Sequence, residues 1–340
     1  MTTAPATTTA RPRIALTLGD PAGVGPELVA RQLADPATTA AAEILIIGDE
    51  QELVDAMADA GVEFAWTREA GTGVPQLVEN DGERPEGGFV RQQATREGGL
   101  WAMASLRRAL ELSKAGEVDA IVFAPLNKSS LHLAGMAEND EMSWFETVLA
   151  DGTSATELNI LPELVTARVT SHCSIAQVAS LIDHDLVVER GELLKAVLQA
   201  RGIEQPRIGV CALNPHAGES GKFGREEIDI IAPAIEELQR RGVDAAGPFP
   251  SDTIFLKARD GAFDGVLTMY HDQGQIAVKL LGFDRGVTMA GGLSVAVCTP
   301  AHGTAFDVVG KRIANTGAYE HAFATAVGVG AQAREARAAD

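Results

Sequence analysis

Short apolar runs alternate with amphipathic stretches along almost the whole chain. Runs rich in aliphatic residues predict strands over residues 14–18, 44–48, 118–126, 164–170, 208–213, 265–270 and 295–299. The spacing of apolar residues between these runs predicts helices over residues 26–34, 50–60, 89–115, 186–200 and 226–241. Residues 70–88 are rich in Gly, Pro and acids, which indicates a surface connection outside the core. The alternation is typical of a doubly wound α/β protein, and no internal repeat is evident.

Composition narrows the possible partners. The 340 residues, 46% of them hydrophobic, are enough to build two lobes that share a cleft. The formal net charge is −19, and no run of Lys and Arg occurs. Such a chain repels phosphate backbones and anionic bilayers, so nucleic-acid and membrane-surface partners are disfavoured. An anionic substrate would need a locally basic pocket, which gives weight to any Lys or Arg within a motif.

The chain ends and the cysteines favour a cytoplasmic protein. Residues 1–13 are rich in Thr, Ala and Pro and lack the apolar segment of a signal peptide, so we expect a disordered extension. Residues 14–340 are expected to form one two-lobed catalytic unit, its lobes interleaved in sequence. No apolar run approaches the roughly 20 residues of a membrane span. Cys173, Cys211 and Cys298 lack CxxC spacing, which favours free thiols over one disulfide and a spare thiol.

Three histidines directly follow predicted strands: His172, His216 and His271. Ligands of α/β sheets bind outside the carboxyl ends of the strands, so we expect these side chains on one rim of the sheet. Three neutral imidazoles with an open position suit a catalytic divalent metal ion, and Asp252 or Asp272 could orient them. A single histidine at a strand end is more often a hydrogen-bonded surface residue. The pattern alone leaves both readings open.

Further polar and glycine-rich segments follow other strands. Residues 19–27, Gly-Asp-Pro-Ala-Gly-Val-Gly-Pro-Glu, could turn backbone N–H groups toward an anion or form a tight strand–helix turn. Residues 302–307, His-Gly-Thr-Ala-Phe-Asp, could approach a sugar-bearing ligand, with Asp307 on a ribose hydroxyl, or could contain plain turn glycines. In an acidic chain, Lys279 and Lys128 are candidates for holding a carboxylate or orienting a proton transfer, although an isolated Lys is more often solvated.

Together these motifs resemble the 4-hydroxythreonine-4-phosphate dehydrogenase family (PdxA-type). The resemblance runs from residue 16 to residue 315 and includes residues 124–128, 213–219, 251–255, 270–274 and 302–305. It implies a two-lobed α/β/α sandwich of the isocitrate/isopropylmalate dehydrogenase type, with the active site in the interlobe cleft. It also implies a homodimer with shared active sites.

The resemblance assigns roles to individual residues. His172, His216 and His271 would bind one Zn²⁺, Mg²⁺, Mn²⁺ or Co²⁺ ion, with His271 donated by the partner subunit. NAD or NADP would lie along His302, Gly303, Thr304, Ala305, Asp307 and Asn315. Lys279 and Asp252 are the expected catalytic side chains, and Asn127 and Lys128 are expected near the substrate, as is Lys279. The implied reaction oxidises a secondary hydroxyl of a small hydroxy acid, followed by loss of CO₂.

The substrate end departs from the family pattern. Family members that act on the phosphorylated threonine analogue carry Gly-His-Thr-Glu where this chain has residues 140–143, Asp-Glu-Met-Ser, so Glu141 and Met142 replace a His and a Thr. Thr288 replaces an Asn, and Val297 replaces an Arg. Without these donors a phosphate site is weakened, as in the terephthalate dihydrodiol dehydrogenases that the chain also resembles. We therefore expect a non-phosphorylated hydroxy acid or a cis-dihydrodiol carboxylate, although Lys128 or Arg285 could replace the lost Arg.

Two alternatives come from other functional classes. The first is an acyl or phosphate transferase on a related fold, and the second is a binding protein that has lost turnover. Residues 302–305 argue against the first, because a transferase needs no dinucleotide pocket. Retention of the three histidines and Lys279 argues against the second.

Overall fold

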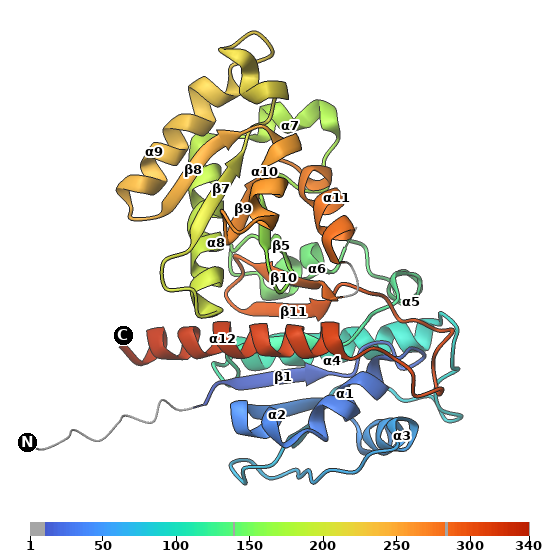
Figure 1. Ribbon diagram of the computed structural model, residues 1–340. Helices are drawn as coiled ribbons and strands as arrows, with labels where there is room; N and C mark the ends of the chain where they lie inside the picture. Colours follow the sequence, from blue (N-terminus) through green and yellow to red (C-terminus); the bar gives the residue numbers. More distant parts are fainter. Residues whose placement is uncertain (1–10, 139, 283–284, 340) are drawn as a thin grey trace, which may run out of the picture.

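The computed structural model describes residues 11–138, 140–282 and 285–339, which form an eleven-stranded mixed sheet between helices (Figure 1). The strands are β1 (Arg13–Thr17), β2 (Glu43–Gly48), β3 (Gln76–Glu79), β4 (Ala120–Phe123), β5 (Thr156–Ile160), β6 (Val165–Arg168), β7 (Arg207–Cys211), β8 (Asp244–Phe249), β9 (Gly265–Thr268), β10 (Val287–Gly291) and β11 (Ala296–Pro300). The helices are α1 (Gly25–Leu33), α2 (Pro36–Ala41), α3 (Glu50–Ala60), α4 (Arg96–Lys114), α5 (Lys128–Leu133), α6 (Glu141–Leu149), α7 (Ile175–Leu181), α8 (His184–Ala200), α9 (Ala232–Arg240), α10 (Ser251–Arg259), α11 (His271–Gly282) and α12 (Gly317–Ala339).

The two halves of the sheet run in opposite directions. The order is β3-β2-β1-β4-β11-β10-β5-β6-β9-β7-β8. All neighbours from β3 to β11 are parallel, and so are all neighbours from β6 to β8. Between them, β10 and β5 pair antiparallel with each other and with their outer neighbours. The chain enters the second half after β4 and returns with β10 and β11, while the exact lobe boundaries stay a prediction.

This arrangement confirms the prediction of one rim for the three histidines. His172, His271 and His216 follow β6, β9 and β7, which are adjacent and parallel, so these three do share a rim. The loops after β1, β4 and β11 leave strands that run the other way. Residues of the loops after β4 and β11 nevertheless line one pocket together with His172.

Most predicted elements are present, and the differences have local causes. The long helix begins at Arg96 instead of residue 89, because the Thr95 side chain caps it by accepting a hydrogen bond from the Gly98 N–H at 3.0 Å. Segment 70–88 contains the edge strand β3, with Leu77 only 3% exposed, so it is not wholly outside the core. Strands β5, β8 and β10 and the C-terminal helix α12 were not predicted.

The N-terminal boundary also moves. Residues 1–10 lie outside the described part of the chain. Arg13, expected in the disordered extension, is the first residue of β1 and donates its backbone N–H to Asp119 at 2.6 Å. The carbonyl of Pro12 accepts a hydrogen bond from the Glu43 N–H at 2.9 Å. Sheet pairing therefore orders the chain before residue 14.

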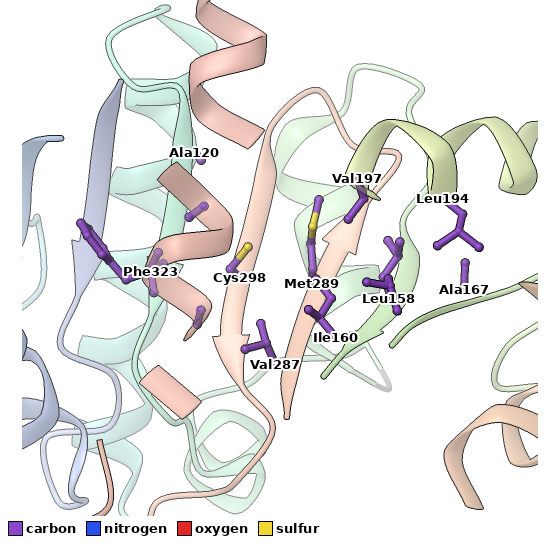
Figure 2. Packing of buried hydrophobic residues seen from close by; sticks show 14 of the residues in the cluster. Ala120, Leu158, Ile160, Ala167, Leu194, Val197, Val287, Met289, Cys298 and Phe323 are labelled. Carbon is purple, nitrogen blue, oxygen red and sulfur yellow. The ribbon is translucent and has the colours of Figure 1, made fainter. Parts of the chain in front are cut away.

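One apolar core crosses the junction between the halves. Met289 on β10 pairs with Cys298 on one side and Leu158 on the other, and all three face the same layer. Figure 2 shows this row between Phe323 of α12 and the α8 residues Leu194 and Val197. The halves are thus packed as one body.

The thiols and the helices agree with the sequence expectations. Cys173, Cys211 and Cys298 are free, with the second and third buried. Burial raises the pKa of the Cys298 thiol to about 12, so this thiol stays protonated and unreactive. Among the described helices, none has the length and apolar character that a membrane crossing demands.

Glu52 is a buried acid in this fold. It lies on α3 with 4% exposure, and Trp101 donates its indole N–H to the Glu52 Oε2 at 2.9 Å. Its Oε1 is buried and has no hydrogen-bond partner among the described residues. Burial, with a smaller contribution from the charge of Asp49, raises the pKa of Glu52 from 4.5 to about 8.

This pKa predicts how stability depends on pH. Because the folded-state pKa lies above the unfolded value, Glu52 destabilises the protein progressively as pH rises from 4.5 to about 8. Glu52→Gln removes this titration, so its melting temperature should fall less than that of the wild type between those pH values. The exposed Glu50→Gln on the same helix serves as the control. Parallel melting curves for wild type and Glu52→Gln across this range would contradict the assignment.

Candidate active site

A pocket of about 310 Å³ lies over the face of the central strands. Its wall combines β4, β5, β10 and β11 with α6 and with the loops that follow β4, β6 and β11. Ala290 on β10 pairs with Glu157 on one side and Val297 on the other, so the three project to one face. The lining includes the predicted site residues Lys128, Glu141, Met142, His172, Thr288, His302 and Gly303.

Other predicted residues lie outside this lining. Asn127 caps α5, where its side-chain oxygen accepts a hydrogen bond from the Ser130 N–H at 3.1 Å. Lys279 is exposed on α11, and Asp252 is exposed near the start of α10. The pocket therefore brings residues of the first half together with His172. The two expected catalytic side chains, Lys279 and Asp252, lie outside it on α11 and α10.

His172 is held by Asp140, a residue for which sequence analysis predicted no role. The His172 Nδ1 lies 2.8 Å from the Asp140 Oδ2, and Asp140 also caps α6 by accepting the Ser143 N–H at 2.8 Å. Burial by itself would raise the pKa of Asp140. Its hydrogen bonds from Ser143, together with the charges of His172 and Lys128, outweigh burial and lower this pKa. The carboxylate orients the imidazole and leaves the Nε2 for a ligand.

His271 stands next to His172. Their ring centroids are 5.6 Å apart, and the His271 Nδ1 lies 2.7 Å from the Asp272 Oδ1. His172 and His216 both have positive φ angles, 30° and 54°, a backbone strain that is common at functional sites. His216 is exposed on the loop after β7. Within the described part of a single chain, no group of three or more His, Cys, Asp or Glu side chains could hold a metal ion.

The loop after β11 packs against the glycine-rich loop after β1. The Val24 N–H donates to the Thr304 carbonyl at 2.9 Å, and a Cβ on Gly23 would come within 2.8 Å of the Thr304 Cβ. His302 places its Nδ1 3.0 Å from the Gly303 carbonyl, and its buried Nε2 has no partner among the described residues. A Cβ on Gly303 would meet nothing within 4 Å, so space for a ligand remains beside this loop. Asp307 and Asn315 are exposed farther along.

Sequence reasoning missed a polar group at the edge of the pocket. Glu157 lines the pocket and forms a 2.6 Å ion pair with Arg168, which is 4% exposed. The signal was available, because Arg168 is a charged residue within the apolar run 164–170. Residues 156–160 carried no strand prediction, so nothing indicated a partner for this arginine.

A second depression, of about 390 Å³, lies between α10 and α11, which stand side by side in the second half (Figure 1). Leu256, Ile276 and Leu280 line it and are 51%, 61% and 83% exposed. Asp252 and Asp272 line it as well, which brings it next to His271. These three side chains form an exposed apolar face on the second half.

Comparison with known proteins identifies relatives over nearly the whole chain. The family model for the pyridoxal phosphate biosynthetic protein PdxA matches residues 40–326. A Pseudomonas aeruginosa protein named "Putative 4-hydroxythreonine-4-phosphate dehydrogenase 2" is 48% identical over 94% of this chain and 97% of its own length.

Solved structures agree with this match. A 4-hydroxythreonine-4-phosphate dehydrogenase from Burkholderia phymatum superposes with a TM-score of 0.76 at 36% identity, over 94% of this chain and 98% of that one. A terephthalate 1,2-cis-dihydrodiol dehydrogenase from Burkholderia xenovorans gives 0.69 at 27% identity, over 93% and 98%. The fold itself is shared with a β-decarboxylating dehydrogenase from Thermococcus kodakarensis, with a TM-score of 0.52 at 16% identity over 93% and 81%.

Proposed function

Since this chain belongs to the PdxA family and is an NAD(P)-dependent oxidoreductase, we propose that it oxidises a secondary hydroxyl of a small, non-phosphorylated hydroxy acid, with loss of CO₂ from the product. The observation that carries the substrate assignment is the charge of the pocket. Among the described residues that line it, Lys128 is the single Lys or Arg, whereas Asp140, Glu141 and Glu157 are acids. Family membership also decides against the transferase alternative.

The charges in the pocket favour a carboxylate over a phosphate dianion. A phosphate site needs several donors, and each missing charge-assisted hydrogen bond costs about 1.5–3 kcal/mol. Acids beside the anion add repulsion. Lys128 can pair with one carboxylate, while Met142, Ala290 and Val297 offer apolar surface to the carbon chain.

The loop after β11 fits the adenosine end of NAD or NADP. The unpartnered His302 Nε2 and the open space at Gly303 provide a polar contact and room for close approach. Thr304 and Ala305 would follow along the dinucleotide, with Asp307 and Asn315 exposed farther on to meet the ribose and base. When bound, the oxidised nicotinamide accepts the hydride that the substrate carbon loses.

A divalent ion fits the histidines if two chains contribute. Asp140 and Asp272 each orient one imidazole through its Nδ1, as carboxylates do behind metal-binding histidines. By the family resemblance, His172 and His216 would come from one subunit and His271 from its partner, although His271 of the same chain also lies beside His172, with ring centroids 5.6 Å apart. When bound, the ion supplies Lewis-acid polarisation of the substrate hydroxyl and carboxylate. Asp252 and Lys279, on the same pair of helices as His271, would then approach the partner's substrate and handle its proton.

The apolar face on α10 and α11 supports the homodimer. Leu256, Ile276 and Leu280 are too exposed to stabilise a monomer, and they adjoin His271. A second copy that covers them would bring His271 toward the partner's pocket. One contact would thus bury apolar surface and complete the site.

The substrate assignment is tested by measuring NADH or NADPH formation with matched pairs of acids. We expect 2,3,4-trihydroxybutanoate or terephthalate cis-dihydrodiol to be oxidised with a kcat/KM at least about tenfold above those of 2,3,4-trihydroxybutanoate 4-phosphate and 4-hydroxythreonine 4-phosphate, the loss that one missing charge-assisted hydrogen bond produces. Efficient oxidation of the phosphorylated acids, with the free acids inert, would overturn it.

The metal assignment is tested by elemental analysis of purified variants. His172→Ala and His271→Ala should each lose the bound ion, and Asp140→Asn should lower its affinity by about 10–100-fold. His184→Ala is a matched control, because the His184 side chain is 40% exposed and is also paired with an aspartate, Asp185, at 2.8 Å. Full metal content in His172→Ala, or activity that survives chelation, would refute the site.

The dimer is tested by analytical ultracentrifugation. The wild type should sediment as a dimer, and Leu280→Asp should sediment as a monomer and lose activity, because a charge replaces the most exposed apolar side chain of this face. Val54→Asp, an exposed apolar position on α3 in the other half, should remain dimeric. A monomeric wild type, or a dimeric Leu280→Asp variant, would show that this face is not the interface.

A further inference from the structure

The pocket contains a buried polar network that the implied reaction does not use. Glu157 on β5 lines the pocket, and its Oε1 accepts hydrogen bonds from three donors. The donors are the Arg168 Nη2 at 2.6 Å, the Asn159 Nδ2 at 3.0 Å and the Gln275 Nε2 at 3.0 Å. Three polar side chains, from β5, β6 and α11, therefore converge on one carboxylate oxygen.

The network fixes Glu157 in place. Arg168 also donates from its Nη2 to the Asn159 Oδ1 at 2.8 Å, and Gln275 donates to the same oxygen at 3.0 Å. Asn159 and Arg168 are 5% and 4% exposed, so water does not compete for these contacts. The carboxylate is held by contacts made within the protein before any ligand arrives.

Only one side of Glu157 is engaged in this way. In the described part of the chain its Oε2 has no hydrogen-bond partner, and the residue lines the pocket. The Arg168 Nη1 is buried without a partner, so the ion pair with Glu157 is the close compensation for that charge. The pair is locally neutral, but Glu157 lines the pocket whereas Arg168 is buried and is not among the residues that line it.

The strand register places Glu157 at the part of the pocket wall where the tail of the substrate would lie. Ala290 separates it from Val297, where the resemblance places an arginine that would bind the substrate phosphate. At this wall the chain offers an apolar side chain and a fixed carboxylate instead of a guanidinium. A fixed carboxylate accepts hydrogen bonds from hydroxyl groups and repels anions.

We propose that Glu157 determines substrate specificity by accepting a hydrogen bond from a free hydroxyl on the tail of the substrate, which makes a polyhydroxy acid the preferred substrate class. Arg168, Asn159 and Gln275 are positioning residues that act through Glu157. This inference rests on the proposed function, since it names the tail of the same hydroxy acid.

The test varies the substrate and the enzyme together, as in a double-mutant cycle. The probes are 2,3,4-trihydroxybutanoate and 2,3-dihydroxybutanoate, which differ by the terminal hydroxyl alone. For the wild type, loss of this hydroxyl should lower kcat/KM about tenfold or more, mainly through KM, as expected for a hydrogen bond to a charged group. In Glu157→Leu/Arg168→Leu this ratio should approach one. The double variant leaves no buried charge unpaired, and such replacements are often neutral for stability.

Two further variants distinguish the fixed position of the Glu157 carboxylate from the overall negative charge of the pocket. Arg168→Leu keeps the carboxylate but removes the ion pair that holds it, so the ratio of kcat/KM between the two probes should fall toward one. Glu141→Gln removes a charge elsewhere in the pocket, so it should keep the hydroxyl preference. Both expectations are read as ratios between the two probes, which a general loss of folded enzyme does not change.

The outcomes distinguish the two proposals. If the wild type oxidises none of the acids with NAD⁺ or NADP⁺, the proposed function fails. If it oxidises both probes with equal kcat/KM, or if the double variant keeps the wild-type ratio, the role of Glu157 is wrong and the proposed function stands. Preference for terephthalate cis-dihydrodiol over 2,3,4-trihydroxybutanoate would likewise overturn the polyhydroxy assignment alone.

Discussion

The antiparallel pairing of β10 with β5 and with β11 is the contact on which the rest of the structure depends. Each half of the sheet is parallel, and without these strands each half would end in unpaired N–H and C=O groups. The pairing satisfies those groups and reverses the strand direction between the halves. On one face it places Met289 between Leu158 and Cys298 in the shared core. On the other face it sets Ala290 between Glu157 and Val297 at the pocket wall.

The alternation of strands and helices was sufficient to predict the fold class. A short run of apolar residues indicates a strand that is buried on both faces, and such strands are typical of an α/β sheet covered by helices. It did not reveal β10 and β5, whose residues are not uniformly apolar. The direction of the second half follows from these two strands. For that reason the sequence placed the three histidines on one rim correctly but did not show that the strands of the other half run in the opposite direction.

The candidate site was predictable where it depends on short motifs and unpredictable where it depends on pairing. His172, Lys128 and His302 each belong to a motif after a strand, and the pocket unites them. Asp140 and Arg168 have no motif of their own. Their significance comes from a partner far along the chain or in a neighbouring strand, and a single sequence does not contain that information.

The oxidation step and the choice of substrate depend on different features of the molecule. Oxidation belongs to the family, and we propose that it uses the loops after β6 and β11. The choice of substrate depends on the charges that line the pocket, where we propose that carboxylates have replaced phosphate donors. The most direct measurement is a crystal structure with NAD⁺ and 2,3,4-trihydroxybutanoate bound. The account predicts the substrate carboxylate beside Lys128 and a tail hydroxyl within hydrogen-bond distance of the Glu157 Oε2. Density for the acid in the depression between α10 and α11, with the pocket empty, would contradict it.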